Sequence, residues 1–285
     1  MHGGGGARAG RSIIVGFLGI ACVGASAACS LLVDVSDLAD GPTGVEAGPN
    51  DVDAGSDVDG SSMPGDGGAT YREVVMADDP LAYYRLDEKT AGIAKDETGR
   101  FEGVHEGELT LGVPPLVADG EAATSFGGAG RIEVASGLDF PGTSPFTVEM
   151  WLSQRVATAD HRFPFFKEEG AGNTRHGYGI AVIDGQVLGE RWGRGSVTSV
   201  SAEVAVGRTA HVVLTYDGQT LALWIDGAFV RSKPDTRSDT PVTAPALIGG
   251  AAGDGFDGTI DELAIYDEAL SPERIKAHYA AGRRE

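Results

Sequence analysis

The chain has 285 residues, a formal net charge of −20, 44 glycines and two cysteines. The excess of acidic residues argues against binding to nucleic acid and against electrostatic attachment to anionic membranes. Because Cys22 and Cys29 both lie near the amino terminus, the long remainder has no disulfide or thiol chemistry and must be stabilised by a hydrophobic core.

The first 28 residues have the pattern of a secretory signal peptide. Arg8 and Arg11 precede an apolar run that extends from Ile13 to Ala25, and small residues follow it. This run is shorter than the roughly 20 residues that a membrane-spanning helix needs. We therefore expect residues 1–28 to direct export and to be removed from the mature protein.

The end of this segment resembles the lipobox of bacterial lipoproteins. Ala27-Ala28-Cys29 stands where the lipobox cysteine becomes the lipidated first residue. The resemblance implies that Cys29 carries a lipid anchor, which would be the protein's contact with the membrane at the outer membrane or cell surface. Lipoboxes favour Leu at the position of Ser26, so cleavage near Ala28 to give a soluble secreted protein is the alternative.

Residues 29–70 have the composition of a tether. From residue 34 onward this segment contains nine acidic residues and no Lys, Arg or aromatic residue. It cannot bury enough apolar surface to offset the entropy lost on ordering, so we predict a disordered, self-repelling chain. The stretch DVDAGSDVDG superficially resembles a calcium loop, but it lacks the final Glu and the flanking helices of an EF-hand.

From residue 71 onward, short apolar runs alternate with turn residues. Runs rich in β-branched and aromatic residues occur at 146–153, 178–183, 209–217 and 220–227. Asp217-Gly218-Gln219 predicts a hairpin between the last two runs, and Asp226-Gly227 predicts the next one. Many short strands and few helical patterns predict an all-β sandwich over residues 71–285.

The last predicted strand, FDGTIDELAIYD (256–267), contains an acidic pair. Strict alternation along a strand would place Asp261 on one face with Leu263 and Ile265, and Glu262 on the opposite face. Two neighbours on opposite faces cannot act together on one bond, so this pair does not predict a catalytic site.

A short carboxy-terminal helix follows this strand. Ser271 is a suitable N-cap, Pro272 fits the first helical position, and Gly282 is placed to end the helix. This is the one convincing helix pattern in the sequence.

The order of several segments resembles one known family, the laminin G-like jelly-roll domains of the concanavalin A-like lectin/glucanase superfamily. The resemblance covers about residues 71–283. It implies a two-sheet antiparallel jelly-roll sandwich in which the closing strand returns beside the amino-terminal strand. The segments that carry it are DDPLAYYRLDE (78–88), KDETGR (95–100), AATSFGGAGRIEV (122–134), SPFTVEMWL (144–152), TAHVVLTYDGQTLALWIDG (209–227) and FDGTIDELAIYDEALSPERIKAHYAAG (256–282).

The resemblance also implies a structural calcium ion at the edge of the sandwich. Asp261 matches the aspartate of the family's final motif, and Asp96 matches the acidic residue of its early loop. Calcium takes six to eight oxygen ligands, and Gly-rich turns expose carbonyl oxygens. The alternative is that both aspartates only accept backbone hydrogen bonds.

The sequence argues against an enzyme. Glucanases of this superfamily need carboxylates in the order Glu, Asp, Glu along one face of a strand, and no such run occurs; Glu149 stands alone. Neither a G-x-S-x-G elbow nor an H-E-x-x-H pair is present. A glycan-active hydrolase of the same fold and a purely structural envelope protein are the alternatives.

The predicted function is recognition of a carbohydrate or an extracellular protein. Sugar sites combine aromatic faces with charged and amide groups, and residues 159–195 are rich in both. We expect them to line one end or the concave face of the sandwich, with solvated loops and a Trp192 packed at a sheet edge as the alternative. The candidate residues are His161, Arg162, Asn173, Arg175, His176, Tyr178 and Trp192.

Three further residues are expected to be structural. Trp151 and Trp224 lie within predicted strands and should belong to the core. His211 matches a position that is common in the family, and we expect its side chain to be buried and hydrogen-bonded.

Overall fold

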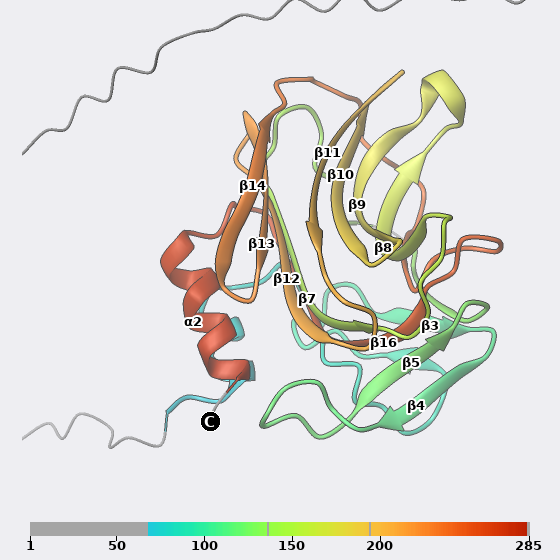
Figure 1. The fold of residues 1–285 in the computed structure, drawn as a ribbon, viewed down its shortest axis with the longest axis vertical. Helices are drawn as coiled ribbons and strands as arrows, with labels where there is room; N and C mark the ends of the chain where they lie inside the picture. Colours follow the sequence, from blue (N-terminus) through green and yellow to red (C-terminus); the bar gives the residue numbers. More distant parts are fainter. Residues whose placement is uncertain (1–67, 136, 194, 284–285) are drawn as a thin grey trace, which may run out of the picture. The chain divides into compact units, whose positions relative to one another are not determined.

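The computed structural model describes residues 68–135, 137–193 and 195–283 (Figure 1). The described residues belong to one compact unit. The predicted signal peptide, Cys29 and nearly all of the predicted tether lie outside the described residues. Within the described ranges, no helix is long and apolar enough to cross a membrane.

The described residues fold into two antiparallel sheets, each with eight strands. The first sheet has the order β14 (Ala228–Pro234), β13 (Thr220–Ile225), β12 (Thr209–Tyr216), β7 (Phe146–Gln154), β16 (Asp257–Tyr266), β5 (Ala123–Gly127) and β4 (Leu109–Val113), and β1 (Ala82–Tyr84) also pairs with β16. The second sheet has the order β11 (Ser196–Glu203), β10 (Gln186–Gly193), β9 (His176–Ile183), β8 (Arg162–Glu169), β15 (Ala246–Ile248), β6 (Arg131–Val134), β3 (Gly103–Glu106) and β2 (Ile93–Ala94).

This architecture confirms the predicted fold class, an all-β jelly-roll sandwich. The four strands predicted in the middle of the chain correspond to β7, β9, β12 and β13. The closing strand β16 pairs with β1, where Tyr83 lies opposite Ala264, as the family resemblance implied. The turn between β13 and β14 has a positive φ at both Asp226 and Gly227 (53° and 74°), which is the geometry of a tight hairpin.

Apolar side chains from both sheets fill the space between them. Phe126 and Leu263 of the first sheet and Phe165, Ile180 and Ile248 of the second are fully buried there. Alternation along each strand sends every second side chain to this inner face. Burying one side chain of this size contributes about 1.5–3 kcal/mol, so this core stabilises the sandwich and leaves the outward face of each sheet for other roles.

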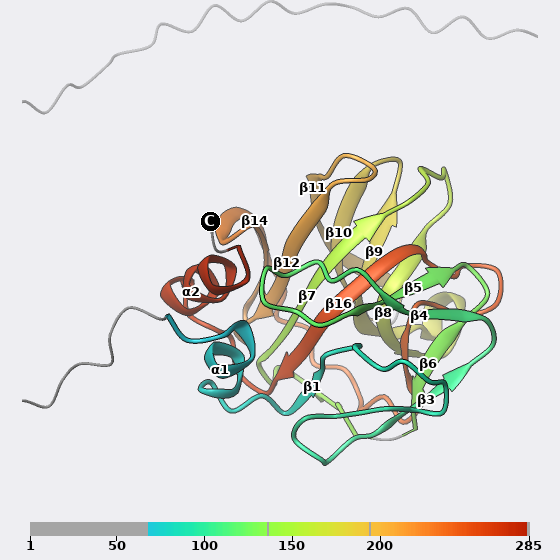
Figure 2. The ribbon, with the colours of Figure 1, turned by 90° about the horizontal axis from the view of Figure 1, so that it is seen from below.

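Two α-helices lie side by side on the outward side of the first sheet (Figure 2). α2 (Pro272–Gly282) begins after Ser271, whose side chain accepts a hydrogen bond from the backbone N–H of Arg274, and it ends at Gly282 as predicted. α1 (Tyr71–Met76) was not predicted. Its sequence signal is a capping box, in which the side chains of Thr70 and Glu73 each accept a hydrogen bond from the other residue's backbone N–H.

A second apolar cluster joins these helices to the first sheet. Tyr71 and Val75 of α1 and Ile275 of α2 pack against Trp151 of β7 and Tyr266 of β16, all of which are buried. Trp151 is therefore a core residue, as predicted. The helices cover the part of the outward face that β7 and β16 form, whereas the residues of β14 stay exposed.

A bulge in β16 makes the predicted strict alternation wrong. Asp261 lies opposite Trp151 of β7, but Ala264, three residues later, lies opposite Glu149, only two residues away. The extra residue is accommodated at Glu262, which has a φ of +51°. Asp261 and Glu262 are therefore both directed to the helix-covered side of the first sheet, and the expected separation onto opposite faces does not occur.

Candidate ligand-binding groove

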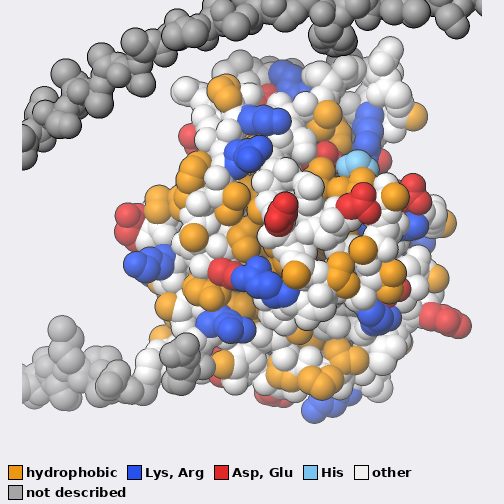
Figure 3. Space-filling model, in the orientation of Figure 1, with side chains coloured by type: hydrophobic (Ala, Val, Ile, Leu, Met, Phe, Trp, Pro, Cys, Tyr) orange, Lys and Arg blue, Asp and Glu red, His pale blue; other side chains and the backbone are white. Residues whose placement is uncertain are grey.

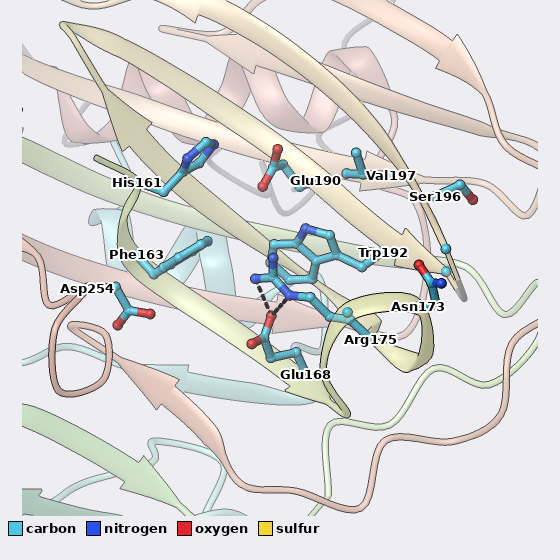
Figure 4. Close-up of a pocket in the computed structure, with 13 residues that line it drawn as sticks. His161, Phe163, Glu168, Asn173, Arg175, Glu190, Trp192, Ser196, Val197 and Asp254 are labelled. Atoms are coloured by element: carbon cyan, nitrogen blue, oxygen red, sulfur yellow. Dashed lines mark hydrogen bonds and ion pairs between the residues drawn. The ribbon is translucent and has the colours of Figure 1, made fainter. Parts of the chain in front are cut away.

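The outward face of the second sheet carries a groove with a volume of about 760 Å³ (Figure 4). Its floor and walls come from β8, β10, β11 and the loops beside them. The outward positions of β9 are Gly177, Gly179 and Ala181, because Tyr178 and Ile180 between them belong to the inner core. The centre of this face therefore has no large side chain of its own, and the groove lies between the larger side chains of the flanking strands.

The glycines of β9 are required by the close approach of β8. A Cβ atom at Gly177 would lie 2.1 Å from the carbonyl oxygen of Lys167, and one at Gly179 would lie 2.7 Å from that of Phe165. Gly177 also has a φ of +140°, which side-chain-bearing residues rarely adopt. The hollow thus follows directly from the sequence of β9.

An aromatic ring under a guanidinium forms one wall of the groove. Trp192 of β10 packs edge-on against Phe163, with ring centroids 5.9 Å apart. The Arg175 guanidinium lies 4.2 Å from the centroid of the Trp192 ring and forms an ion pair with Glu168. Burial raises the pKa of the Glu168 carboxyl, and the hydrogen bond from Arg175 only partly offsets this effect.

Glu190 lies two residues before Trp192 on the same face of β10. It is only 6% exposed, and it stands opposite Gly179 on β9 and Ser199 on β11. No described residue donates a hydrogen bond to its carboxylate or forms an ion pair with it. Figure 4 shows this side chain directed into the groove, between His161 and Val197.

The charges around the groove are unbalanced. Among the described residues, three carboxylates, those of Glu168, Glu190 and Asp254, line it with the single guanidinium of Arg175. One Asp254 oxygen accepts a hydrogen bond from the backbone N–H of Ala251 at 2.8 Å. On the face seen in Figure 3, acidic and basic side chains are interspersed, whereas the groove concentrates negative charge.

The structure brings together some of the predicted ligand-binding residues and separates others. His161, Arg175 and Trp192 line the groove, and so does Asn173. Arg162 instead donates a hydrogen bond to the carbonyl oxygen of Gly253 at 2.6 Å.

His176 and Tyr178 differ more clearly from the prediction. Both occupy inward positions of β9; the Tyr178 ring lies in the inner core, and its hydroxyl donates to the Leu138 carbonyl at 2.8 Å. His176 is 7% exposed and contacts Thr240 through Nε2 at 3.2 Å. The strand predicted from the sequence began at Tyr178, and both residues were still assigned to the ligand site, whereas β9 begins at His176.

Sequence reasoning missed Phe163, Glu168, Glu190 and Asp254, which also line the groove. One signal was available for Glu190. Within a strand, residues two apart share a face, so a Trp192 directed outward implies that Glu190 is directed outward as well. Asp254 comes from a turn, and Phe163 lies at the register shift between Arg162 and Phe165 of β8, so the sequence gives no such rule for either.

A buried polar cluster lies on the outward face of the first sheet, beneath the helices. Glu149 is fully buried. It has no neighbouring carboxylates on its strand, but other side chains surround it. Its carboxylate accepts hydrogen bonds from the Tyr71 hydroxyl at 2.5 Å, His211 Nε2 at 2.8 Å and His278 Nδ1 at 2.8 Å. The other ring nitrogen of His278 lies 2.7 Å from Asp78 Oδ2. His211 is therefore buried and hydrogen-bonded, as expected.

The charges in this cluster stabilise one another. Burial acts to raise the pKa of Glu149, but the neighbouring His278 and His211 outweigh it and hold this pKa well below its usual range. Burial acts to lower the pKa of His278, but Glu149 and Asp78 outweigh it and raise this pKa. Because Glu149, His211 and His278 are buried and bonded to one another, the cluster ties α2 to the sheet.

The two aspartates predicted to bind calcium have separate hydrogen-bonding roles. The Asp96 carboxylate accepts hydrogen bonds from the backbone N–H groups of Tyr83, Thr98, Arg100 and Phe101 at 2.8–3.0 Å. A fifth bond comes from the Thr98 hydroxyl at 2.6 Å. Burial acts to raise the pKa of Asp96, but these bonds outweigh it and lower the pKa.

Asp261 is buried, and one of its oxygens accepts a hydrogen bond from the backbone N–H of Leu116 at 2.7 Å. Burial raises its pKa to about 7, and burial together with the Asp261 charge raises the pKa of Glu262 to about 8. The described part of the chain holds no group of three His, Cys, Asp or Glu side chains arranged for a metal ion. The donors around Asp96 fit the hydrogen-bonding alternative, whereas Oδ1 of Asp261 is buried without a hydrogen-bond partner among the described residues. Calcium binding stays a prediction.

A two-sheet antiparallel sandwich with a polar groove on one outward face defines a jelly-roll module. Residues 126–276 match the family model of the concanavalin A-like lectin/glucanases superfamily. The chain therefore belongs to this superfamily. A comparison with curated proteins found no match.

Several solved structures share the fold. Domain 4 of an extracellular GH43 arabinanase from Geobacillus stearothermophilus, in complex with arabinotriose, has a TM-score of 0.54 and 21% identity over 70% of this chain and 98% of that chain. The binding domain of Paraclostridial Mosquitocidal Protein 1 has a TM-score of 0.55 and 15% identity, over 72% of this chain and 52% of that chain. The binding domain of botulinum neurotoxin DC, in complex with rat synaptotagmin II, has a TM-score of 0.57 and 12% identity, over 73% and 52%. The chain thus spans about half of each toxin domain, and at these identities the likeness shows the fold alone.

Proposed function

We propose that residues 71–285 form an extracellular recognition module that binds a carbohydrate in the groove on the second sheet. The observation that carries this proposal is the stack of Arg175 on Trp192 beside a hollow of about 760 Å³ lined by polar side chains. Ligand sites commonly have volumes of about 300–1,000 Å³ and combine aromatic walls with a few polar groups. The arabinanase domain that shares this fold is in complex with an oligosaccharide, which supports the same ligand class here.

The groove offers both kinds of contact that a sugar needs. The planar Arg175 guanidinium, held on Trp192 and by Glu168, presents a flat surface to a sugar ring. The carboxylate of Glu190 can accept hydrogen bonds from hydroxyl groups, and the amide of Asn173 can both donate and accept them. Binding in this manner requires no bond to be broken, and the proposed activity is recognition without catalysis.

The cellular location is proposed from the sequence. A signal peptide, a lipid on Cys29 and an acidic tether would place the module outside the cytoplasm at the outer membrane or cell surface. Metabolic labelling with a fatty-acid analogue tests this. We expect the wild-type protein to be labelled and Cys29→Ser to lose the label, whereas an unlabelled wild-type protein would indicate the soluble secreted alternative.

A protein partner is the second candidate, because a toxin domain of the same fold is in complex with a protein receptor. A glycan array probed with the chain expressed from residue 30 distinguishes the two. We expect binding to a subset of glycans, with affinity reduced about tenfold by Arg175→Ala. The control is Arg231→Ala, which removes a guanidinium from the exposed strand β14 of the other sheet. The carbohydrate proposal fails if no glycan binds, or if Arg175→Ala leaves the affinity unchanged.

A further inference from the structure

We infer that the groove selects a glycan that carries free amino groups, such as a chain with glucosamine units, and that Glu190 binds the ammonium group. This inference rests on the proposed function, since it names the ligand class of the same groove. Nothing in the fold of a jelly-roll sandwich by itself requires such a preference. The preference follows from the hydrogen-bond partners and the charges of the groove residues.

The Glu190 carboxylate has no partner among the described residues. Its side chain is directed into the groove and is more than nine-tenths buried, yet no described residue donates to it or pairs with it. Its carboxylate oxygens are not among the fully buried, unpaired atoms of the described residues, so they reach solvent in the groove, where water or a ligand can donate to them. A ligand in the groove can supply the missing donor.

The charges of the groove residues favour a positively charged partner for Glu190. Among the described residues of the lining, Arg175 is the one guanidinium, and it is already engaged by Glu168 and Trp192. The remaining carboxylates, Glu190 and Asp254, therefore leave the described part of the lining negative. The negative charge would repel a uronic or sialic acid. A neutral sugar would donate hydrogen bonds to Glu190 without compensating its charge, whereas a protonated amine both donates hydrogen bonds and compensates the charge.

Glu190 lies beside the Arg175–Trp192 stack. Glu190 and Trp192 are two residues apart on one face of β10, so their side chains lie side by side about 7 Å apart along the strand. A sugar ring resting on the Arg175–Trp192 stack places its ring substituents within reach of Glu190. An amino substituent on that ring is thus a suitable partner for the carboxylate.

The opposite sheet provides an internal comparison. Glu149 and Trp151 have the same spacing on β7 and are also directed outward, but there the chain supplies two imidazoles and a phenol to the carboxylate. The fold is therefore able to satisfy a glutamate at such a position. At Glu190 it does not, and the groove remains open to a ligand.

The test compares two oligosaccharides of equal length, a glucosamine tetramer and its N-acetylated counterpart, by calorimetry with the chain expressed from residue 30 at pH 6, where the amine is charged. We expect the free-amine tetramer to bind about tenfold more tightly, a difference of about 1.4 kcal/mol. Glu190→Gln keeps the size of the side chain and removes its charge, so we expect it to reduce this preference to about twofold or less. Glu203→Gln, on β11 of the same sheet and outside the groove lining, is the control and should retain the preference.

Each other outcome has a defined meaning. Equal binding of the two tetramers, or a preference that survives Glu190→Gln, overturns this inference and leaves the carbohydrate proposal standing. Failure of every glycan to bind overturns both. A trilysine peptide that binds as tightly as the glucosamine tetramer would assign the groove to a basic protein segment and overturn the glycan class. Melting curves of Glu190→Gln verify that the variant is folded.

Discussion

The outward faces of the two sheets carry the same short pattern, a glutamate and a tryptophan two residues apart on one strand. On β7 this pair is Glu149 and Trp151, and on β10 it is Glu190 and Trp192. Helices α1 and α2 cover the first pair, and Glu149 is fully buried among groups that donate to it. No helix covers the second pair, and Glu190 has no partner among the described residues.

This difference shows how one pattern serves two roles. A carboxylate that loses water must gain donors, and the chain provides them for Glu149 from segments that lie 62 and 129 residues away in sequence. The glutamate then contributes to stability. Where the chain provides none, as at Glu190, the same residue type is available to a ligand. The comparison therefore separates a helix-covered, structural face from the face for which we propose ligand binding.

The largest expected effect is on the covered face. Glu149→Gln removes the charge that His278 and His211 surround, and it leaves buried donors without their acceptor. Breaking a buried charged pair costs about 3–5 kcal/mol, so we expect the free energy of unfolding, measured with urea, to fall by about this amount. Glu203→Gln, the exposed control, should change it by less than about 0.5 kcal/mol. A loss of that small size in Glu149→Gln would show that the cluster is not needed for stability.

The covered face should also make stability depend on pH. Because burial raises the pKa of Asp261 to about 7 and that of Glu262 to about 8, the folded state keeps protons that the unfolded state has lost. The free energy of unfolding should therefore fall by several kcal/mol as the pH rises from about 4 to 8, because each unit by which the folded-state pKa exceeds the unfolded one is worth about 1.4 kcal/mol. The raised pKa of His278 acts in the same direction, since its contribution is lost as the pH rises.

Urea denaturation at several pH values checks this dependence. Glu262→Gln removes one of the two coupled carboxyls and should flatten the decline between pH 4 and 8. An equally steep decline in this variant would mean that other groups control the pH dependence of stability.

A smaller effect is expected on the uncovered face. Arg175→Ala removes the guanidinium that covers Trp192, a contact worth about 0.5–1 kcal/mol at a partly exposed position. We expect a loss of stability of this size and a shift of tryptophan fluorescence to longer wavelength as Trp192 becomes solvated. Arg231→Ala serves as the control with no expected shift. An unchanged emission spectrum in Arg175→Ala would indicate that Trp192 is covered by other groups.

No effect is expected from removing calcium. The hydrogen bonds to Asp96 use both of its carboxylate oxygens, so EDTA and added calcium should give the same melting temperature. A rise with calcium that disappears in Asp96→Asn or Asp261→Asn would instead establish the calcium site that the family resemblance implies.

Local signals in the sequence were sufficient for much of the fold. Alternating runs predicted four strands, and the Ser271 cap with Gly282 predicted α2, because strand alternation and helix caps depend on neighbouring residues. The capping box of Thr70 and Glu73 is equally local, but α1 has only six residues and gives no periodic pattern to accompany it. The bulge at Glu262 depends on the facing strand β7 and could not be predicted from β16 alone.

The candidate site was harder to predict, for a physical reason. Trp192, Arg175 and His161 were found by residue type, but Tyr178 was assigned to the groove although it lies in the core. Whether a side chain in this stretch points inward or outward depends on where β9 begins, and the sequence does not show that boundary. The lack of a partner for Glu190 is a property of the whole fold.

The free energy of unfolding of Glu190→Gln tests the account most directly, because Glu190 has no partner within the described part of the chain. Replacing a buried, unpaired carboxylate by a neutral amide of the same shape should leave the stability unchanged or raise it by up to about 1 kcal/mol. A loss comparable to that of Glu149→Gln would contradict the account, since it would mean that Glu190, like Glu149, stabilises the protein through partners of its own.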